Sequence, residues 1–156
     1  MKNERGSLVV SSPEFIGDGK IPVQYTADGA GVNPPLTFDG VPEGTQYLAL
    51  IMEDPDAPGG TFTHWLLWDI PEATSISEHT TLGVSGRNSA GKNGYFPPDP
   101  PAETGSHRYY FHVFALDTGL DLKPGAERDA LQSAMEGHIL AAGTMMARYG
   151  RLEEHA

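Results

Sequence analysis

The chain has 156 residues, a formal net charge of −11 from 21 acidic and 10 basic residues, and no cysteine. Its length suits one domain that spans residues 1–156. The absence of cysteine excludes disulfides, thiolate metal sites and a cysteine nucleophile. The acidic balance disfavours nucleic acid and anionic membrane surfaces as partners, because both are bound through lysine and arginine.

The start of the chain carries no recognisable targeting signal. It reads MKNERGSLVV, which is charged and lacks the apolar core of a signal peptide. No apolar run in the chain approaches the roughly 20 residues that span a bilayer. These features predict a cytoplasmic protein that does not insert into membranes. Glycine (19) and proline (13) are frequent and spread out, which indicates many turns in a β-rich fold.

The first half of the chain predicts strands. Short strands are expected at residues 7–15, 21–26 and 36–38. QYLALIMED, residues 46–54, is the first strong strand, and both of its alternating faces are apolar, as in a strand that is covered on both sides. HWLLWDI, residues 64–70, is the second, and the two-residue period places His64, Leu66, Trp68 and Ile70 on one face.

The second half predicts one long strand and then helix. SHRYYFHVFALD, residues 106–117, is the longest strand, with His107 and Tyr109 on one face and Tyr110 and His112 on the other. Residues 126–150 predict helix through an apolar stripe made of Ala130, Leu131, Ala134, Met135, His138, Ile139 and Ala142. Gly137 and Gly143 each disfavour helix by about 1 kcal/mol, so a bend or break is expected near them.

Three groups that could carry chemistry stand at strand ends. Asp54 ends the first strong strand, while His64 and His107 begin the next two. If these strands are neighbours, the three groups meet at one end of the sheet. Prolines stiffen the adjoining loops, Pro55 and Pro58 after Asp54 and four more in YFPPDPP, residues 95–101. Loops of this kind present a surface for function.

Each of these residues also has a purely structural interpretation. A histidine at a strand start is commonly a structural hydrogen-bonding group, and Asp54 before Pro55 could cap the turn with its side chain. Arg108 could pair with Asp56 to brace the loop. Two histidines and a carboxylate also form a metal-binding set, but close ligand spacing is absent and no metal or cofactor is expected. The chain has no G-x-S-x-G elbow and no P-loop, so no catalytic residue is assigned.

Three segments resemble one known family. They are DPDAPGGTFTHWLLWDIP, GKNGYFPPDPPAETGSHRYYFHVFALD and MEGHILAAGTMMARYGR. In this order and spacing they resemble the phosphatidylethanolamine-binding protein family, most of all its bacterial and archaeal branch of Raf kinase inhibitor-like proteins. The resemblance runs from about Leu8 to Arg151. It implies a mainly β fold, a sandwich with a large central antiparallel sheet, a smaller second sheet and peripheral C-terminal helices.

The resemblance also implies a shallow anion-binding pocket at one end of the large sheet. The implied ligand-binding positions are Asp54, His64, Pro101, His107 and Tyr109, and the supporting positions are Asp56, Pro58 and Arg108. Imidazole and phenol groups can donate hydrogen bonds to a phosphate-like group, and histidine titration predicts binding that strengthens as pH falls through about 6.5. Asp54 is expected to orient an imidazole, because a carboxylate that faced a dianion would repel it.

One part of the motif departs from the family pattern. Where relatives in this branch carry Tyr-Gly-Gly-Pro, this chain has Phe96 and Pro97 in place of the glycines, and Asp99 follows. Glycine permits close approach of the backbone and supplies an N–H group that proline lacks. These changes are expected to narrow the pocket or to favour a less charged ligand.

Three functions remain open from the sequence. The first is a non-catalytic protein that binds a small anion such as phosphate, phosphoethanolamine or a carboxylate, with a regulatory role as one option. The second is a protein–protein regulator that resembles kinase or serine-protease inhibitors. The third is a hydrolase that uses Asp54, His64 and His107 as acid–base groups, although no nucleophile is evident. A homodimer is a further expectation, with the face of Tyr110, His112 and Phe114 as either core or dimer contact.

Overall fold

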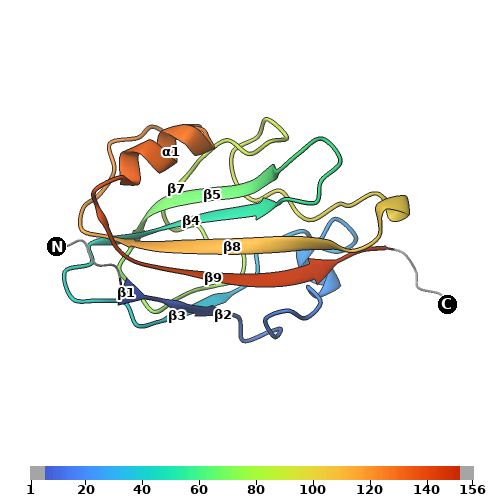
Figure 1. Ribbon diagram of the computed structural model, residues 1–156, viewed down its shortest axis with the longest axis horizontal. Helices are drawn as coiled ribbons and strands as arrows, with labels where there is room; N and C mark the ends of the chain where they lie inside the picture. The colour runs from blue at the N-terminus through green and yellow to red at the C-terminus, as the bar shows by residue number, and fades with distance from the viewer. Residues whose placement is uncertain (1–5, 152–156) are drawn as a thin grey trace.

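The computed structural model describes residues 6–151, which form two packed β-sheets and a short α-helix (Figure 1). The large sheet has the strand order β1 (Gly6–Ser7), β9 (Ile139–Tyr149), β8 (His107–Leu116), β4 (Tyr47–Asp54), β5 (Phe62–Pro71) and β7 (Val84–Ser85). The small sheet contains β2 (Val9–Ser11), β3 (Leu36–Asp39) and β6 (Ser75–Ile76). The helix α1 spans Arg128–Met135, and two 3-10 turns span Val23–Tyr25 and Ala102–Thr104. The predicted mainly β sandwich with a larger and a smaller sheet is confirmed.

β4 is the central strand of the large sheet, and both of its faces are buried. It pairs with β5 on one side and with β8 on the other, antiparallel in both cases. Leu48, Leu50 and Met52 pack into the core between the two sheets, whereas Ala49 and Ile51 belong to a second core beneath α1. The prediction of a strand that is covered on both faces is therefore confirmed.

The sheet and the N-terminal segments differ from the prediction in two details. β1 pairs with β9 in parallel, so the large sheet is mixed and not wholly antiparallel. The segment 21–26 was expected to be a strand, but it contains a 3-10 turn at Val23–Tyr25 that buries the Tyr25 ring completely. The short segment takes its conformation from this anchored ring and not from its β-forming composition.

The predicted C-terminal helix is correct for its first third and wrong beyond it. α1 ends at Met135, Gly137 turns the chain with a φ of 81°, and Ile139–Tyr149 continues as β9 beside β8. Its buried side chains follow the two-residue period of a strand: Ala141, Met145, Ala147 and Tyr149. Among residues 6–151 no helix is long and apolar enough to cross a membrane.

β5 departs from regular alternation, and one departure aims His64. Two consecutive residues near the end of β4 pair with residues of β5 that are two positions apart, which leaves His64 as an extra residue in a bulge. A bulge re-aims the side chain of the extra residue. His64 therefore packs against Tyr109 of the inter-sheet core, with 5.3 Å between the ring centroids. The prediction that His64 shares a face with Leu66 and Trp68 is wrong, because those two side chains pack beneath α1.

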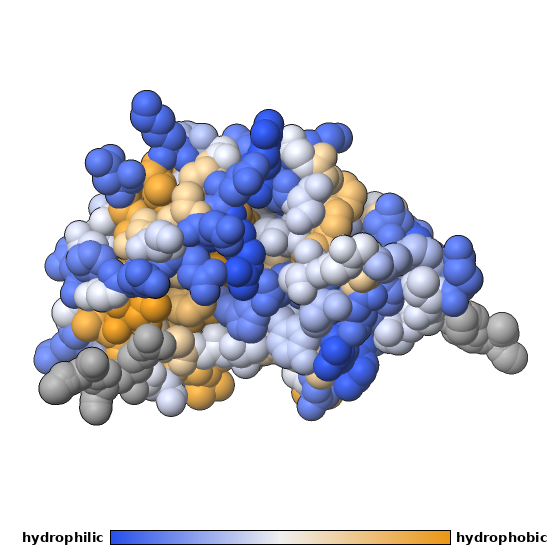
Figure 2. Space-filling view, turned by 45° about the horizontal axis from the view of Figure 1, so that its top comes forward, coloured by the Kyte–Doolittle hydropathy of each residue, from blue (hydrophilic) through white to orange (hydrophobic). Residues whose placement is uncertain are grey.

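The side chains on the outer face of β8 make contacts within the chain. His112 Nε2 lies 3.1 Å from a carboxylate oxygen of Glu53, and the ring of Tyr110 stacks on His112 at 5.9 Å between centroids. Phe114 packs against the core beneath α1. Figure 2 shows one face of the molecule, where hydrophilic side chains separate smaller hydrophobic patches. The homodimer stays a prediction.

Gly143 lies where the N-terminal segment crosses β9 closely. A Cβ atom on Gly143 would lie 2.1 Å from the carbonyl oxygen of Leu8, so the N-terminal segment can cross β9 only where a side chain is missing. We expect Gly143→Ala to lower the free energy of unfolding by about 1–3 kcal/mol, the usual cost of overpacking, in urea titrations followed by circular dichroism. Gly59→Ala is the control, because its Cβ would have no neighbour within 4 Å. Equal stability of the two variants would contradict this account.

Candidate functional site

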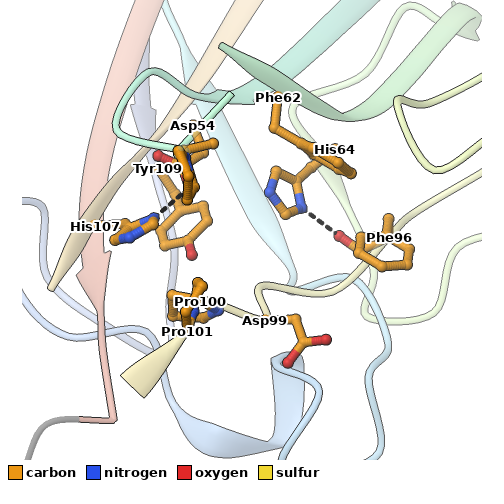
Figure 3. Close-up of a pocket in the computed structure, with 11 residues that line it drawn as sticks. Asp54, Phe62, His64, Phe96, Asp99, Pro100, Pro101, His107 and Tyr109 are labelled. Atoms are coloured by element: carbon orange, nitrogen blue, oxygen red, sulfur yellow. Dashed lines mark hydrogen bonds and ion pairs between the residues drawn. The ribbon is translucent and has the colours of Figure 1, made fainter. Parts of the chain in front are cut away.

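A cavity of about 200 Å³ lies at one end of the large sheet (Figure 3). Because β4 runs antiparallel to both neighbours, its last residue lies beside the first residues of β5 and β8. The cavity is lined by Asp54, Ala57, Pro58, Phe62, His64, Phe96, Asp99, Pro100, Pro101, His107 and Tyr109. All five positions that the family resemblance implies for ligand binding, and Pro58, therefore meet at this cavity. Asp56 and Arg108 stand outside its lining.

Asp54 and His107 form a buried pair in the wall of the cavity. His107 Nδ1 lies 2.6 Å from one oxygen of Asp54 and donates its proton, because a carboxylate can only accept. The other oxygen of Asp54 accepts the backbone N–H of Asp56 at 2.8 Å. Only 3% of Asp54 and 2% of His107 are exposed. Both oxygens of Asp54 are thus engaged, and the carboxylate orients the imidazole.

Thr104 holds the second nitrogen of His107. The Thr104 hydroxyl lies 2.8 Å from His107 Nε2 and 2.8 Å from the carbonyl oxygen of Pro101, and it can donate its single proton to only one of these two atoms at a time. Thr104 is not among the residues predicted from the sequence. The available signal was a hydroxyl residue three positions before His107, across a Gly-Ser pair that allows a tight turn.

His64 is held by the backbone of the proline-rich loop. Its Nδ1 donates to the carbonyl oxygen of Phe96 at 2.7 Å, and the backbone N–H of Phe96 donates back to the carbonyl oxygen of His64 at 2.9 Å. Burial lowers the pKa of His64 below its usual value, although the Phe96 carbonyl opposes the shift. The imidazole is therefore mainly neutral at pH 7. Its Nε2 keeps a free lone pair, has no partner among residues 6–151 and points toward the opposite wall in Figure 3.

Tyr109 supplies a second free polar atom. Its side chain is buried, but it borders the cavity, and no hydrogen bond within residues 6–151 engages its hydroxyl group. Burial, reinforced by the nearby carboxylate of Asp54, raises the pKa of Tyr109, so the phenol keeps its proton. In Figure 3 the hydroxyl points into the space between His64 and His107. Besides the carboxylates of its lining, the cavity thus presents one ring-nitrogen acceptor and one hydroxyl donor.

The remaining wall is apolar and carries no basic side chain. Phe62 and Phe96 lie 5.6 Å apart between ring centroids, and Phe96 also lies 5.9 Å from the ring of His64. Of the residues that depart from the family pattern, Phe96 and Asp99 line the cavity, whereas Pro97 packs near Gly31. The lining contains no lysine or arginine. An open cavity therefore persists beside Phe96, with an aromatic wall and an acidic rim.

Two arginines fasten the loops around the cavity. Arg108 binds both oxygens of Asp56, at 2.8 and 2.9 Å, which confirms the predicted pair. Arg151 reaches Asp99 at 2.6 Å, the carbonyl oxygen of Pro100 at 2.6 Å and Asp28 at 2.9 Å. Arg151 is likewise not among the predicted residues, because its partners are distant in the chain and carry no spacing signal. Among residues 6–151, no cluster of three histidine or acidic side chains has an arrangement suited to a metal ion.

The Asp56–Arg108 pair gives a pH-dependent prediction. The Arg108 guanidinium lowers the pKa of Asp56 from 3.8 to about 2 against the opposing effect of burial. A carboxylate with a lowered pKa in the folded state stabilises the fold fully above 3.8, and this contribution is lost as pH falls through about 2. We expect Asp56→Asn to unfold at lower urea than the native chain at pH 7, with the difference gone near pH 2.

The control for this measurement is Asp121→Asn. Asp121 is exposed and forms no ion pair within residues 6–151. A difference for Asp56→Asn that stayed constant between pH 7 and pH 2 would show that the ion pair does not brace the loop.

Comparisons with known proteins place the chain in a family. Residues 11–150 match the model of the phosphatidylethanolamine-binding protein family. A UPF0098 protein of Pyrococcus horikoshii is 45% identical over 157 aligned positions, which cover 95% of this chain and 79% of that protein.

Solved structures agree with this match. A phosphatidylethanolamine-binding protein homologue from Chlamydia trachomatis has a TM-score of 0.88 and 36% identity, and covers 96% of this chain and 99% of its own. YbcL of E. coli has a TM-score of 0.84 and 26% identity, and the alignment covers 93% of this chain and 99% of YbcL. The chain therefore belongs to the phosphatidylethanolamine-binding protein family.

Proposed function

We propose that this protein binds a small oxyanion without catalysing its conversion, with a phosphoryl group as the preferred ligand. The observation that carries the proposal is the pair of free polar atoms, His64 Nε2 and the Tyr109 hydroxyl, which face one cavity. Preformed polar atoms in a concave site are the usual mark of a ligand pocket. The proposed ligand-binding residues are Asp54, His64, Pro101, His107 and Tyr109.

The roles of these residues differ. Tyr109 donates its proton to an oxygen of the ligand. His64 contributes Nε2, which accepts a proton from the ligand or carries one itself at lower pH. Asp54 and His107 are hydrogen-bonded to each other and form part of the wall, so the carboxylate of Asp54 interacts with His107 and not with the ligand. Pro101 closes the rim. Protein partners, the homodimer, the cytoplasmic location and a regulatory role stay predictions.

The proposal predicts saturable and pH-dependent binding. We expect phosphate and phosphoethanolamine to shift the NMR signals of His64, His107 and Tyr109. Because burial lowers the pKa of His64 below its usual value of 6.5, the imidazole gains its proton and the affinity rises mainly as pH falls below 6.5. His64→Ala should reduce the affinity at least ten-fold, the usual effect of losing a hydrogen bond to a charged group.

The control variant is His138→Gln. His138 pairs with Asp117 at 2.9 Å, next to the first residue of β9 and so at the end of that strand remote from the cavity. This variant should bind as the native chain does. Binding that His64→Ala left unchanged, or the absence of any saturable shift at millimolar ligand, would refute the proposed function.

A hydrolase is the second candidate, and one observation favours it. The hydroxyl of Thr104, the imidazole of His107 and the carboxylate of Asp54 are joined by hydrogen bonds of 2.8 and 2.6 Å. This is the connectivity of nucleophile, base and orienting acid in hydrolytic triads. Two facts support binding over hydrolysis: Thr104 is absent from the cavity lining, and its hydroxyl also bonds to the Pro101 carbonyl. We therefore assign Thr104 to the positioning of His107.

Thr104→Ala separates the two candidates. If Thr104 only positions His107, the native chain should show no turnover of nitrophenyl esters or phosphates, and the variant should lose affinity for phosphate while remaining folded. Turnover by the native chain that disappears in Thr104→Ala and returns in Thr104→Ser would instead establish the hydrolase. Circular dichroism of the variants controls for folding.

A further inference from the structure

We infer that the cavity selects an oxyacid that still carries one proton and bears a small apolar substituent, such as the monoanion of an organic phosphonate or phosphate ester. The inference rests on the proposed oxyanion-binding function and specifies its ligand. It follows from three features of the cavity: a fixed acceptor, a single free hydroxyl group and an apolar wall without cations.

The acceptor is His64 Nε2. A carbonyl oxygen can only accept, so the 2.7 Å contact with the Phe96 carbonyl places the ring proton on Nδ1. The neutral ring then directs a lone pair from Nε2 into the cavity (Figure 3). An oxygen without a proton would face this lone pair with its own and be repelled. A P–O–H group donates to it.

The donor is the Tyr109 hydroxyl. It is free of partners within residues 6–151, and it lies on the same wall as His107. Both nitrogens of His107 are engaged, by Asp54 and Thr104, so His107 has no free N–H for the ligand. One ligand oxygen therefore accepts from Tyr109 while another donates to His64. A singly protonated oxyacid supplies both functions on adjacent oxygens.

The charges around the cavity favour the same form of the ligand. The lining carries two carboxylates, Asp54 and Asp99, and no lysine or arginine. Arg151 approaches the rim, but its guanidinium is bound to Asp28, Asp99 and the Pro100 carbonyl. A dianion would enter this site without a cation to neutralise it, and proteins pair or neutralise charges that they bury. A ligand that retains its proton lowers this cost.

The apolar substituent is inferred from the wall. Phe62 and Phe96 stand together beside His64, and Pro58, Pro100 and Pro101 complete the lining. Where the family pattern has glycine, the Phe96 ring occupies the rim and offers contact area. A methyl or phenyl group on the ligand would replace water on this surface and gain from its burial. Inorganic phosphate has no apolar group that could pack against this wall.

A matched pair of ligands tests the inference on the unmodified protein. Phenylphosphonate monoanion and benzenesulfonate have the same shape and the same charge, and they differ by one acidic proton. At pH 6, where phenylphosphonate is mainly the monoanion, we expect it to bind at least ten-fold more tightly than benzenesulfonate and more tightly than inorganic phosphate, in NMR titrations that follow Tyr109 and His107.

Two variants assign the selectivity to its atoms. His64→Phe removes the acceptor and should abolish the preference for phenylphosphonate over benzenesulfonate. Tyr109→Phe should weaken both ligands by a similar factor and leave their ratio unchanged, and His138→Gln should change neither. Equal binding of both ligands to the native chain would overturn the inference while leaving oxyanion binding intact. Binding of neither ligand, nor of phosphate, would overturn the proposed function and the inference with it.

Discussion

The hydrogen bond between Asp54 and His107 is the constraint on which the rest of the site depends. Both groups are buried, and a buried carboxylate without a partner would cost several kcal/mol. The bond joins the last residue of β4 to the first residue of β8 and so fixes the end of the sheet around the cavity. The same bond pairs the carboxylate of Asp54 with His107, so this carboxylate does not face the ligand directly. Inside the rim that carries Asp99, the cavity is left with uncharged groups, His64 and Tyr109, as its free polar atoms, and this decides which ligands it suits.

A local irregularity of the sheet places the second histidine. In a strand with strict alternation, His64 would share a face with Leu66 and Trp68 and point toward α1. The bulge at His64 turns it instead into the space between the two sheets, where Tyr109 and the proline-rich loop receive it. One wall of the cavity therefore comes from a regular strand, β8, and the other comes from the bulge in β5. Bulges are common beside functional sites for this reason.

The sequence predicted much of this arrangement, but the remainder depends on contacts between distant residues. Alternating apolar residues identified β4, β5 and β8, and charged groups at their ends indicated the site. Residues 139–149 were predicted as helix from an apolar stripe, but their pairing with β8 makes them a strand. The roles of Thr104 and Arg151 had no periodic signal. The bulge at His64 was also invisible, because it arises from the pairing register and not from composition.

The attachment of His64 to the main chain separates two properties of the site. The hydrogen bond that orients the imidazole comes from the backbone carbonyl of residue 96, and the N–H of residue 96 bonds to the backbone carbonyl of His64, so neither bond requires the Phe96 side chain. A substitution at this position can enlarge or reduce the aromatic wall while the same ring nitrogen continues to face the ligand. The size of the accepted ligand and the protonation state that it must have are thus encoded independently. Evolution can alter the first in a single step without disturbing the second.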